Sequence, residues 1–328
     1  MSNYLDEMFI DDVKGCLMSS CSGSGGVEIN NQDKTITENG VYTADEGYTG
    51  LGEVTVDVMA TIDGDELMKA IISRTATEIV SDVETIGSYA FYEYDVLKRV
   101  NFPKVKRIEQ YTFKDCVGLE YVNCPNVTYI GANAFNGCKQ LSTMNCDNVE
   151  SVDKSVFSNC IALETLEMPA LESIGQLSFS DCGIKSINFP NLRIVNAQSF
   201  YNCKSLETVI LPKLTTSSSN MLFSGCTALK FADFASLKSI GSSAINKCSS
   251  LSTLILRITS QLVTLSAANY ISVDSPIATG TGYIYVPSAL IEDYKAATNW
   301  STYAAQFRAL EDYTVDGTTT GALDETKI

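Results

Sequence analysis

A unit of 22 residues repeats along the middle of this chain, with three consecutive copies at 108–129, 130–151 and 152–173. This fixed period restricts the fold more than any other feature of the sequence. One copy is too small to bury its own apolar side chains, so neighbouring copies must stack and share a core. The sequence therefore predicts an elongated solenoid, an architecture that more often binds partners than catalyses reactions.

Every copy keeps the same residue types at the same positions, and eight copies can be aligned over 86–261. A β-branched residue opens the copy, an apolar residue, usually Phe, follows five positions later, and Cys usually stands three positions after that. A Leu and a pair of apolar residues complete the pattern. Because these positions recur once per coil, we expect them to form the shared core. The aromatic column consists of Phe91, Phe113, Phe135, Phe157, Phe179, Phe200 and Phe223.

The parts of one copy have different conformational preferences. The stretch from Leu97 to Phe102 ends in alternating apolar and polar residues, which predicts a strand with one buried face. Pro103 should end that strand because it has no backbone N–H to donate. Gly131 follows an opening β-branched residue, where we expect a sharp turn. Each coil should then contain a strand, a turn, a second short extended piece and one helical turn around the Phe.

The pattern I-G-x-x-A-F-x-x-C-x-x-L-x-x-V-x-x-P resembles the BspA-like leucine-rich repeats of bacterial surface proteins. The resemblance covers the eight copies and more than half of the chain. It implies an α/β solenoid with one short strand and a helical turn per coil. Members of this family are commonly surface adhesins or host-interaction proteins, so the resemblance also implies a role in recognition.

The flanks of the repeats should form smaller modules. A helix that begins at Pro287 and runs through Phe307 is expected to close the last coil, because an exposed terminal coil would aggregate. The predicted segments are an N-terminal docking segment with a Gly/Ser linker (1–26), a small β module (27–60), a cap helix with a partial repeat (61–85), the solenoid (86–261) and a C-terminal cap (262–328).

Residues 35–58 resemble a short module of tail-associated proteins from phages and prophages of gut Firmicutes. The resemblance rests on the pattern N-G-x-Y-x-A-x-x-G-Y-x-G-x-x-x-V-x-V-x-V, which begins with the tight-turn dipeptide Asn39-Gly40. It implies a virion component. The alternative is an N-terminal β cap without any such meaning.

The first residues of the chain favour docking onto a partner. Apolar residues at helical spacing precede the linker SGSGG at 22–26, and a helix of this kind gains most of its stability by packing against something else. We expect this helix to bind other virion or surface proteins. The predicted docking residues are Leu5, Met8, Phe9, Val13 and Leu17.

The net charge of −16 lies in the flanks, whereas the repeats are nearly neutral. Acidic flanks keep the protein in solution and argue against nucleic acid as a partner. No apolar run approaches the ~20 residues of a membrane helix, so we expect no membrane insertion. Residues 1–15 carry four acids before the first Lys and lack the features of a secretory signal. We therefore expect cytoplasmic synthesis and non-Sec release, which places the protein in a virion or on an extracellular surface.

Eleven Cys and no His limit the available chemistry. Without His, the common Ser-His and Cys-His nucleophile pairs cannot form. Seven Cys share one repeat position, so we expect a column of buried, reduced thiols that act as small hydrophobes. Zinc is the alternative, but the nearest spacings, Cys16/Cys21 and Cys116/Cys124, do not provide C-x₂-C pairs. The sequence predicts no enzyme, no metal and no cofactor.

The outward strand positions form two columns of side chains, which we expect to face a glycan or protein on a host surface. Asn and Thr supply donors and acceptors, and Tyr121 can stack on a sugar. The alternative is that polar ladders merely satisfy the exposed sheet. The predicted ligand-binding residues are Arg99, Asn101, Tyr121, Asn123, Thr143, Asn145, Thr165, Glu167 and Asn188. The same columns of outward-pointing side chains continue along the chain through Phe231, Asp233 and Ile255.

A basic run in the first coil has two interpretations. Such runs are usually solvated faces, but this one could meet a phosphate-rich cell-wall polymer. The run consists of Lys98, Arg99, Lys104, Lys106 and Arg107.

Three functional hypotheses follow, all non-enzymatic. The first is a phage tail-associated or bacterial surface protein whose solenoid contacts a glycan or protein. The second is a purely structural virion component that docks through its N-terminus. The third is an intracellular protein–protein interaction protein of the repeat class. Neighbouring tail genes would favour the first two, and a sortase or secretion gene would favour a cell-wall adhesin.

Overall fold

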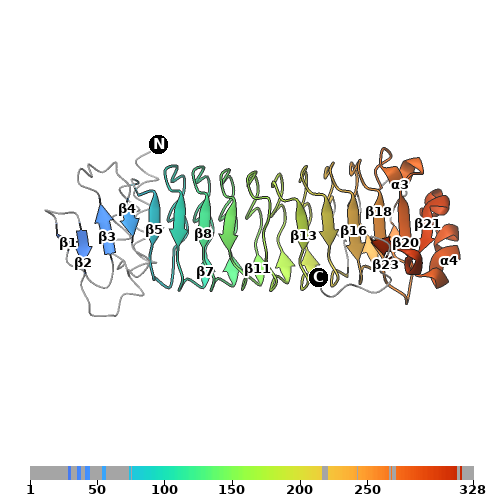
Figure 1. Cartoon of the computed structure of the whole chain (residues 1–328), viewed down its shortest axis with the longest axis horizontal. Helices are drawn as coiled ribbons and strands as arrows, with labels where there is room; N and C mark the ends of the chain where they lie inside the picture. Colours follow the sequence, from blue (N-terminus) through green and yellow to red (C-terminus); the bar gives the residue numbers. More distant parts are fainter. Residues whose placement is uncertain are drawn as a thin grey trace. The chain divides into compact units, whose positions relative to one another are not determined.

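The computed structural model describes residues 74, 76–215, 221–241, 243–265, 267 and 271–315, together with short strands at 29–30, 35–37, 41–44, 54–56 and 318–319. The chain divides into two compact units, Met1–Leu163 and Glu164–Ile328, hereafter the N-terminal and C-terminal units. Each unit contains coils built from parallel strands, which confirms the predicted solenoid (Figure 1).

A wide parallel sheet runs along one side of the N-terminal unit, in the order β10-β8-β6-β5. Paired residues lie one repeat apart, so that Arg99 pairs with Tyr121 and Tyr121 with Thr143. In β6, β8 and β10 only the middle residue is buried, as the period of two predicts. The strands are β5 (Glu78–Val80), β6 (Arg99–Asn101), β8 (Tyr121–Asn123) and β10 (Thr143–Asn145).

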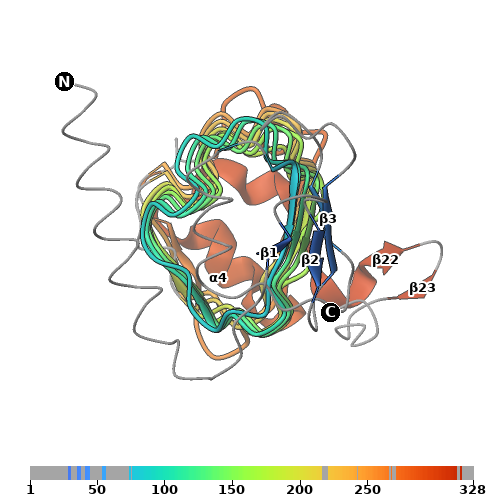
Figure 2. The same ribbon diagram turned by 90° about the vertical axis from the view of Figure 1, so that its left-hand side faces the viewer.

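A second, narrow parallel sheet forms at the predicted second extended piece. Each strand has two residues and buries only the second, which is β-branched. Figure 2 looks along the coils and shows the chain closing loops around a central interior. The narrow strands of this unit are β7 (Arg107–Ile108), β9 (Tyr129–Ile130) and β11 (Ser151–Val152).

The C-terminal unit repeats this plan with a six-stranded wide sheet in the order β13-β15-β16-β18-β20-β21. Its neighbouring strands all pair in parallel. The wide strands are β13 (Ser186–Asn188), β15 (Thr208–Ile210), β16 (Phe231–Phe234), β18 (Thr253–Leu256), β20 (Tyr283–Val286) and β21 (Phe307–Ala309). The narrow strands pair as β12 (Ser173–Ile174) with β14 (Ile194–Val195), and β17 (Ser239–Ile240) with β19 (Thr264–Leu265).

The segment around each Phe is not the predicted helical turn but a run of hydrogen-bonded turns. Two residues per coil have left-handed φ, for example Tyr111 at 60° and Asp115 at 58°. The N–H groups of Tyr111, Phe113 and Asp115 donate to carbonyl oxygens of the next coil, over 2.9, 2.8 and 2.7 Å. A helix would direct these N–H groups along its own axis instead. Bonding between coils therefore replaces helix formation in this segment.

Gly131 serves close approach between coils and not the sharp turn expected from the sequence. Its φ is not left-handed, but a Cβ atom at this position would lie 2.7 Å from the backbone N of Gln110. Any side chain would therefore push the two coils apart.

The core is a stack of aromatic rings, as the Phe column predicts. In the N-terminal unit the ring centroids of Phe91 and Phe113 lie 5.0 Å apart, and those of Phe113 and Phe135 lie 5.1 Å apart. The planes are within 8° of parallel. All of these rings are fully buried. Stacking of equivalent residues in successive coils is the means by which short repeats share one core.

The C-terminal cap is broken into short pieces where one helix was predicted from Pro287 to Phe307. Its core is the buried Trp300, which donates to the carbonyl of Val263 over 2.7 Å, and Tyr294, whose hydroxyl accepts from Val263 N–H over 2.8 Å. The pieces are α3 (Pro276–Thr279), η2 (Ser288–Leu290), α4 (Ile291–Ala296), η3 (Ser301–Gln306) and η4 (Leu310–Asp312), followed by the hairpin β22 (Thr314–Val315) and β23 (Thr318–Thr319). Non-helical backbone at Tyr303 interrupts η3.

Four short strands form an antiparallel sheet before the first coil, in the order β1-β2-β3-β4. They are β1 (Ile29–Asn30), β2 (Thr35–Thr37), β3 (Val41–Ala44) and β4 (Val54–Val56). The cap helix was predicted in the first part of the segment 61–85, and residues 61–73 lie outside the described residues. The docking residues Leu5, Met8, Phe9, Val13 and Leu17 also lie outside them. The proposed segment boundaries stay predictions.

Candidate binding surface

The outward side of the wide sheet in the N-terminal unit, hereafter the N-terminal strand face, gathers six of the predicted ligand-binding residues. It is supported from beneath by the buried Val100, Val122 and Met144. Each outward side chain is half-buried or exposed. The face consists of Arg99, Asn101, Tyr121, Asn123, Thr143 and Asn145.

Three Asn side chains on this face form a hydrogen-bonded ladder. Asn123 Nδ2 donates to Asn101 Oδ1 over 2.7 Å, and Asn145 Nδ2 donates to Asn123 Oδ1 over 2.8 Å. An amide has two N–H protons and two acceptor lone pairs. Asn123 thus keeps one proton and one lone pair beyond the ladder. The ladder fixes the orientation of these remaining groups.

Arg99 and Tyr121 form a second fixed pair on the same face. The guanidinium carbon of Arg99 lies 4.2 Å from the centroid of the Tyr121 ring, a cation–π distance. Its Nε lies 3.6 Å from Glu78. One face of the Tyr121 ring is therefore covered, and a sugar could stack only on the other face.

The remaining predicted residues lie in the C-terminal unit. Thr165, Glu167 and Asn188 are all exposed. Asn188 ends β13, whereas Thr165 and Glu167 stand in a stretch without strand pairing. The regular strand face expected there is absent at residues 165–167.

Two residues predicted to point outward are buried in the C-terminal unit. Asp233 and Ile255 are 5% and 0% exposed. The cause is the C-terminal segment, which returns over the wide sheet and packs Tyr313 on Phe231 and Tyr285. Beneath it Asp233 pairs with Arg257, whose Nη2 lies 2.8 Å away. Burial raises the pKa of the Asp233 carboxyl although Arg257 opposes the shift.

The same segment helps to create an aromatic patch that was not among the predicted binding residues. Alternation in the strand YIYV at 283–286 was the available signal, because it places Tyr283 and Tyr285 outward over buried Ile284 and Val286. The contribution of Tyr313 had no such signal. The aromatic patch consists of Phe231, Tyr283, Tyr285, Arg308 and Tyr313.

The basic run of the first coil is largely neutralised by acids. Lys104 pairs with Asp82 of the preceding coil, and this hydrogen bond raises the pKa of the Lys104 ammonium. Arg107 pairs with Glu109 over 3.0 Å. The arrangement favours a solvated face over a site for phosphate-rich polymer.

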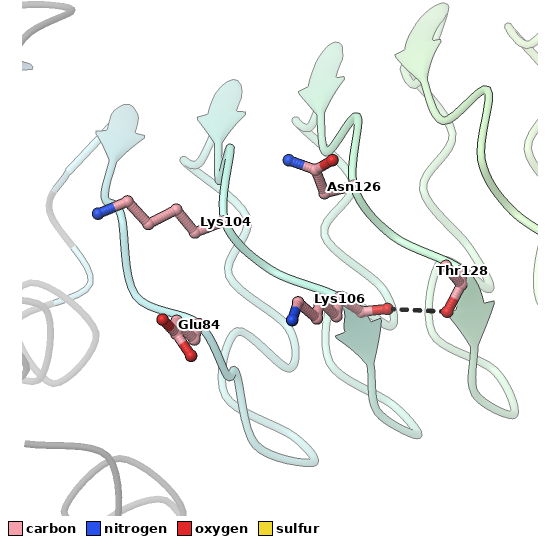
Figure 3. A pocket seen from close by; sticks show the side chains of 5 residues that line it. All are labelled: Glu84, Lys104, Lys106, Asn126 and Thr128. Carbon is pink, nitrogen blue, oxygen red and sulfur yellow. Dashed lines mark hydrogen bonds between the residues drawn. The ribbon is translucent and has the colours of Figure 1, made fainter.

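An open pocket of about 410 Å³ lies beside this basic run. Figure 3 shows the nitrogen atoms of Lys104, Lys106 and Asn126 extending in one direction. Its lining combines acid, base, amide and hydroxyl groups, namely Glu84, Lys104, Lys106, Asn126 and Thr128. Because drug-like ligands prefer mostly apolar pockets, this hollow suits water or a polar ligand better.

The Cys column is buried, as predicted, and also satisfies backbone groups. Cys138 Sγ donates to the carbonyl of Phe113 over 3.0 Å, and Cys160 Sγ donates to that of Phe135 over 3.1 Å. Burial raises the pKa of the Cys116 and Cys248 thiols to about 12. Nine Cys in the described part of the chain are buried. Across those same residues, His, Cys, Asp and Glu do not gather in groups of three that would hold a metal ion.

The residues that build these coils match the sequence profile of a known family. The BspA type leucine rich repeat region (6 copies) matches residues 64–182 and 150–271, together more than half of the chain. The chain belongs to this family. The Phe and Cys columns and the strands of the coils belong to the BspA type repeat. The aromatic patch also involves the segment that follows the matched residues.

Several solved leucine-rich repeat structures are similar to this BspA type chain. A T. pallidum leucine rich repeat protein is 21% identical, with a TM-score of 0.42 over 52% of this chain and 76% of that one. A leucine-rich repeat protein from Bacteroides ovatus is 21% identical, with a TM-score of 0.31 over 72% and 84%. A leucine rich cell surface protein from Faecalibacterium prausnitzii is 15% identical, with a TM-score of 0.32 over 88% and 95%.

No protein with a curated description matches the chain. Within the described residues, none of the helices has both the length and the apolar character needed to cross a membrane.

Proposed function

We propose that this chain is a non-catalytic recognition protein whose N-terminal strand face binds a glycan or a protein on a host surface. The observation that carries the proposal is the Asn101–Asn123–Asn145 ladder. Binding loses less free energy when polar groups are already fixed before the ligand arrives, because their rotamers need not be ordered. The ladder supplies such groups at intervals of one strand, about 4.8 Å.

The neighbouring charges favour a polar, extended ligand. Arg99 is an exposed cation held over Tyr121, and Thr143 adds an exposed hydroxyl to the same face. Such a flat surface offers many weak contacts in place of one deep pocket. Extended glycan chains and the polar side of a partner protein both meet this description.

The place of action is part of the proposal. Members of the family are often cell-surface proteins, and the resemblance of residues 35–58 to tail modules supports a virion instead. In both settings an exposed solenoid meets a foreign surface. Tail genes next to the gene would support the virion version, and a sortase or secretion gene would support the cellular one.

The test is a face variant with a matched control from the same coils. The face variant carries Tyr121→Ala, Asn123→Ala and Asn145→Ala. The control carries Arg107→Ala and Tyr129→Ala, because Arg107 lies 4.1 Å from the Tyr129 centroid and repeats the Arg99–Tyr121 geometry on the narrow sheet. Both proteins are assayed on a glycan array, against intact bacterial cells, and by thermal melting.

We expect the face variant to bind about 10- to 100-fold more weakly, since each lost hydrogen bond costs about 0.5–1.5 kcal/mol. The control should bind like wild type. If the folded face variant binds as well as wild type, or both variants lose binding equally, the ladder only stabilises the sheet and the proposal is wrong.

A further inference from the structure

We propose that the aromatic patch of the C-terminal unit binds a carboxylate-bearing sugar. The patch lies on the outward side of β20 and β21 and on the returning segment at Tyr313. The proposal uses residues of the C-terminal unit alone and is independent of the function proposed for the N-terminal strand face. Its elements are a set of crossed aromatic rings and one guanidinium group.

The rings of the patch stand at steep angles to one another. Tyr283 and Tyr285 have centroids 6.3 Å apart and planes crossed at 72°, and Tyr285 and Tyr313 have centroids 4.7 Å apart and planes crossed at 64°. Tyr283 is 37% exposed, and Tyr285 and Tyr313 are half-buried. Crossed rings present a face and an edge together. A pyranose can pack its C–H face on one ring and direct hydroxyls to the next.

Arg308 is held in place by its own backbone surroundings. Its Nη1 donates to the carbonyls of Ala305 and Phe307, over 2.9 and 2.7 Å. Its guanidinium carbon lies 4.3 Å from the Tyr283 centroid. These contacts leave Nε and Nη2, the edge that a carboxylate takes in a bidentate pair. A cation fixed in this way loses little rotamer freedom when it binds an anion.

Two other Arg residues that stack on a Tyr already have a carboxylate partner. In the Arg99–Tyr121 and Arg107–Tyr129 stacks, the guanidinium also pairs with Glu78 or Glu109. Among the described residues, Arg308 stacks on its Tyr without an acidic partner. Arg308 thus makes the same kind of cation–π contact as the other two, although its Tyr lies two residues from its strand partner Tyr285. It differs from them because the described residues supply no carboxylate to it.

The nearby Arg257 shows the pairing that Arg308 lacks. Its Nε and Nη2 bind the Asp233 carboxylate over 2.9 and 2.8 Å. That pair is buried beneath Tyr313, with side-chain exposures of 10% and 7%. Arg308 is exposed, so its carboxylate can come from outside the chain. We therefore assign the sugar carboxylate to Arg308 and the sugar ring to Tyr283 and Tyr285.

The experiment uses the full chain and two pairs of probes that differ only in the carboxylate. A tetramer of galacturonic acid is compared with its methyl ester, and sialyllactose is compared with lactose, each by isothermal titration. The variants are Arg308→Gln, Tyr283→Leu and Tyr283→Phe. The control is Arg193→Gln, which removes the same charge at an exposed site of the same unit.

We expect at least one acidic probe to bind the wild type about tenfold more tightly than its neutral counterpart, because a charge-assisted pair is lost in the latter. Arg308→Gln should remove this preference, and Arg193→Gln should keep it. Tyr283→Leu should weaken the acidic probe while Tyr283→Phe keeps it, with thermal midpoints unchanged.

Four results would overturn the proposal. One is equal binding of the acidic and neutral probes, and another is no binding of either acidic probe. The third is binding of an acidic peptide, but of neither sugar, that depends on Arg308, which would identify the occupant as a protein. Loss of binding in Arg193→Gln to the same degree would count as non-specific charge and also contradict it.

Discussion

At the scale of the residue, single side chains do two tasks at once. Phe135 stacks between Phe113 and Phe157, with centroids 5.1 and 5.6 Å away, and it also lies beside the thiol of Cys160, which donates to its carbonyl. The ring is fully buried. The aromatic column therefore stabilises its own coil and the coils on both sides.

Replacing Phe135 by Ala should destabilise the N-terminal unit by about 3–5 kcal/mol, because a fully buried ring leaves a cavity that its neighbours cannot fill. Thr143→Ala, an exposed change in the following strand, should stay within about 0.5 kcal/mol of wild type. Denaturant unfolding of both variants measures the difference. A cost below about 1 kcal/mol for Phe135→Ala would show that the ring does not carry the core.

At the scale of the element, hydrogen bonds between coils decide the structure of the turn segment. Alternate N–H groups there reach the next coil, and the thiols of the Cys column donate to Phe carbonyls of the preceding coil. Both sets of bonds require that the coils stay stacked. We therefore expect a substitution in the Cys column to destabilise the neighbouring coils as well as its own coil.

The buried thiols should make the solenoid less stable in alkali. Burial raises the pKa of Cys138 well above its ordinary value, whereas in the unfolded chain it returns to about 8.5. Between pH 8.5 and 10 the unfolded state then holds fewer protons than the folded state, so the free energy of unfolding falls as pH rises. Each such thiol contributes at most about 1.4 kcal/mol per pH unit.

The measurement is urea unfolding at pH 7.5 and pH 9.5 for wild type and for Cys138→Ala. The alanine variant should be less stable at both values but should lose less on the change to pH 9.5. In parallel, a thiol reagent should label Cys138 slowly in the native protein and fast after unfolding. An equal pH loss in both proteins, or rapid native labelling, would contradict a buried, protonated thiol.

At the scale of the whole molecule, the excess of acidic residues lies outside the repeats in the sequence. The repeats are nearly neutral, and the flanks carry the acidic excess behind the net charge of −16. Nearly neutral repeats can meet a neutral or mildly anionic surface without long-range repulsion of their own.

Deletion of residues 1–26 should leave the thermal melt of the repeats nearly unchanged and should abolish assembly with partner chains. The reason is that the apolar positions of this segment suit docking outside the solenoid. A full-length variant with Leu5→Asp and Phe9→Asp controls for chain length and should behave in the same way. Calorimetry and co-purification with the products of neighbouring genes check both statements, and loss of the repeat transition would show that the segment caps the solenoid.

The sequence alone determined the solenoid, its register and its core. A period of 22 residues records which positions meet from coil to coil, so Val100 above Val122 and Phe113 above Phe135 follow from counting. The outward positions of β6, β8 and β10 follow from the period of two. Such features are predictable because the same residue types recur at the same positions in each copy.

Only the tertiary structure decided the features that do not repeat. Left-handed φ at Tyr111 and Asp115 replaced the expected helical turn, because bonding to the next coil outweighed local helix formation. The burial of Asp233, and with it the aromatic patch, depended on Tyr313, which lies eighty residues further along the chain. A contact made once between distant segments leaves no period in the sequence, and its energy exists only when the coils beneath it have already stacked.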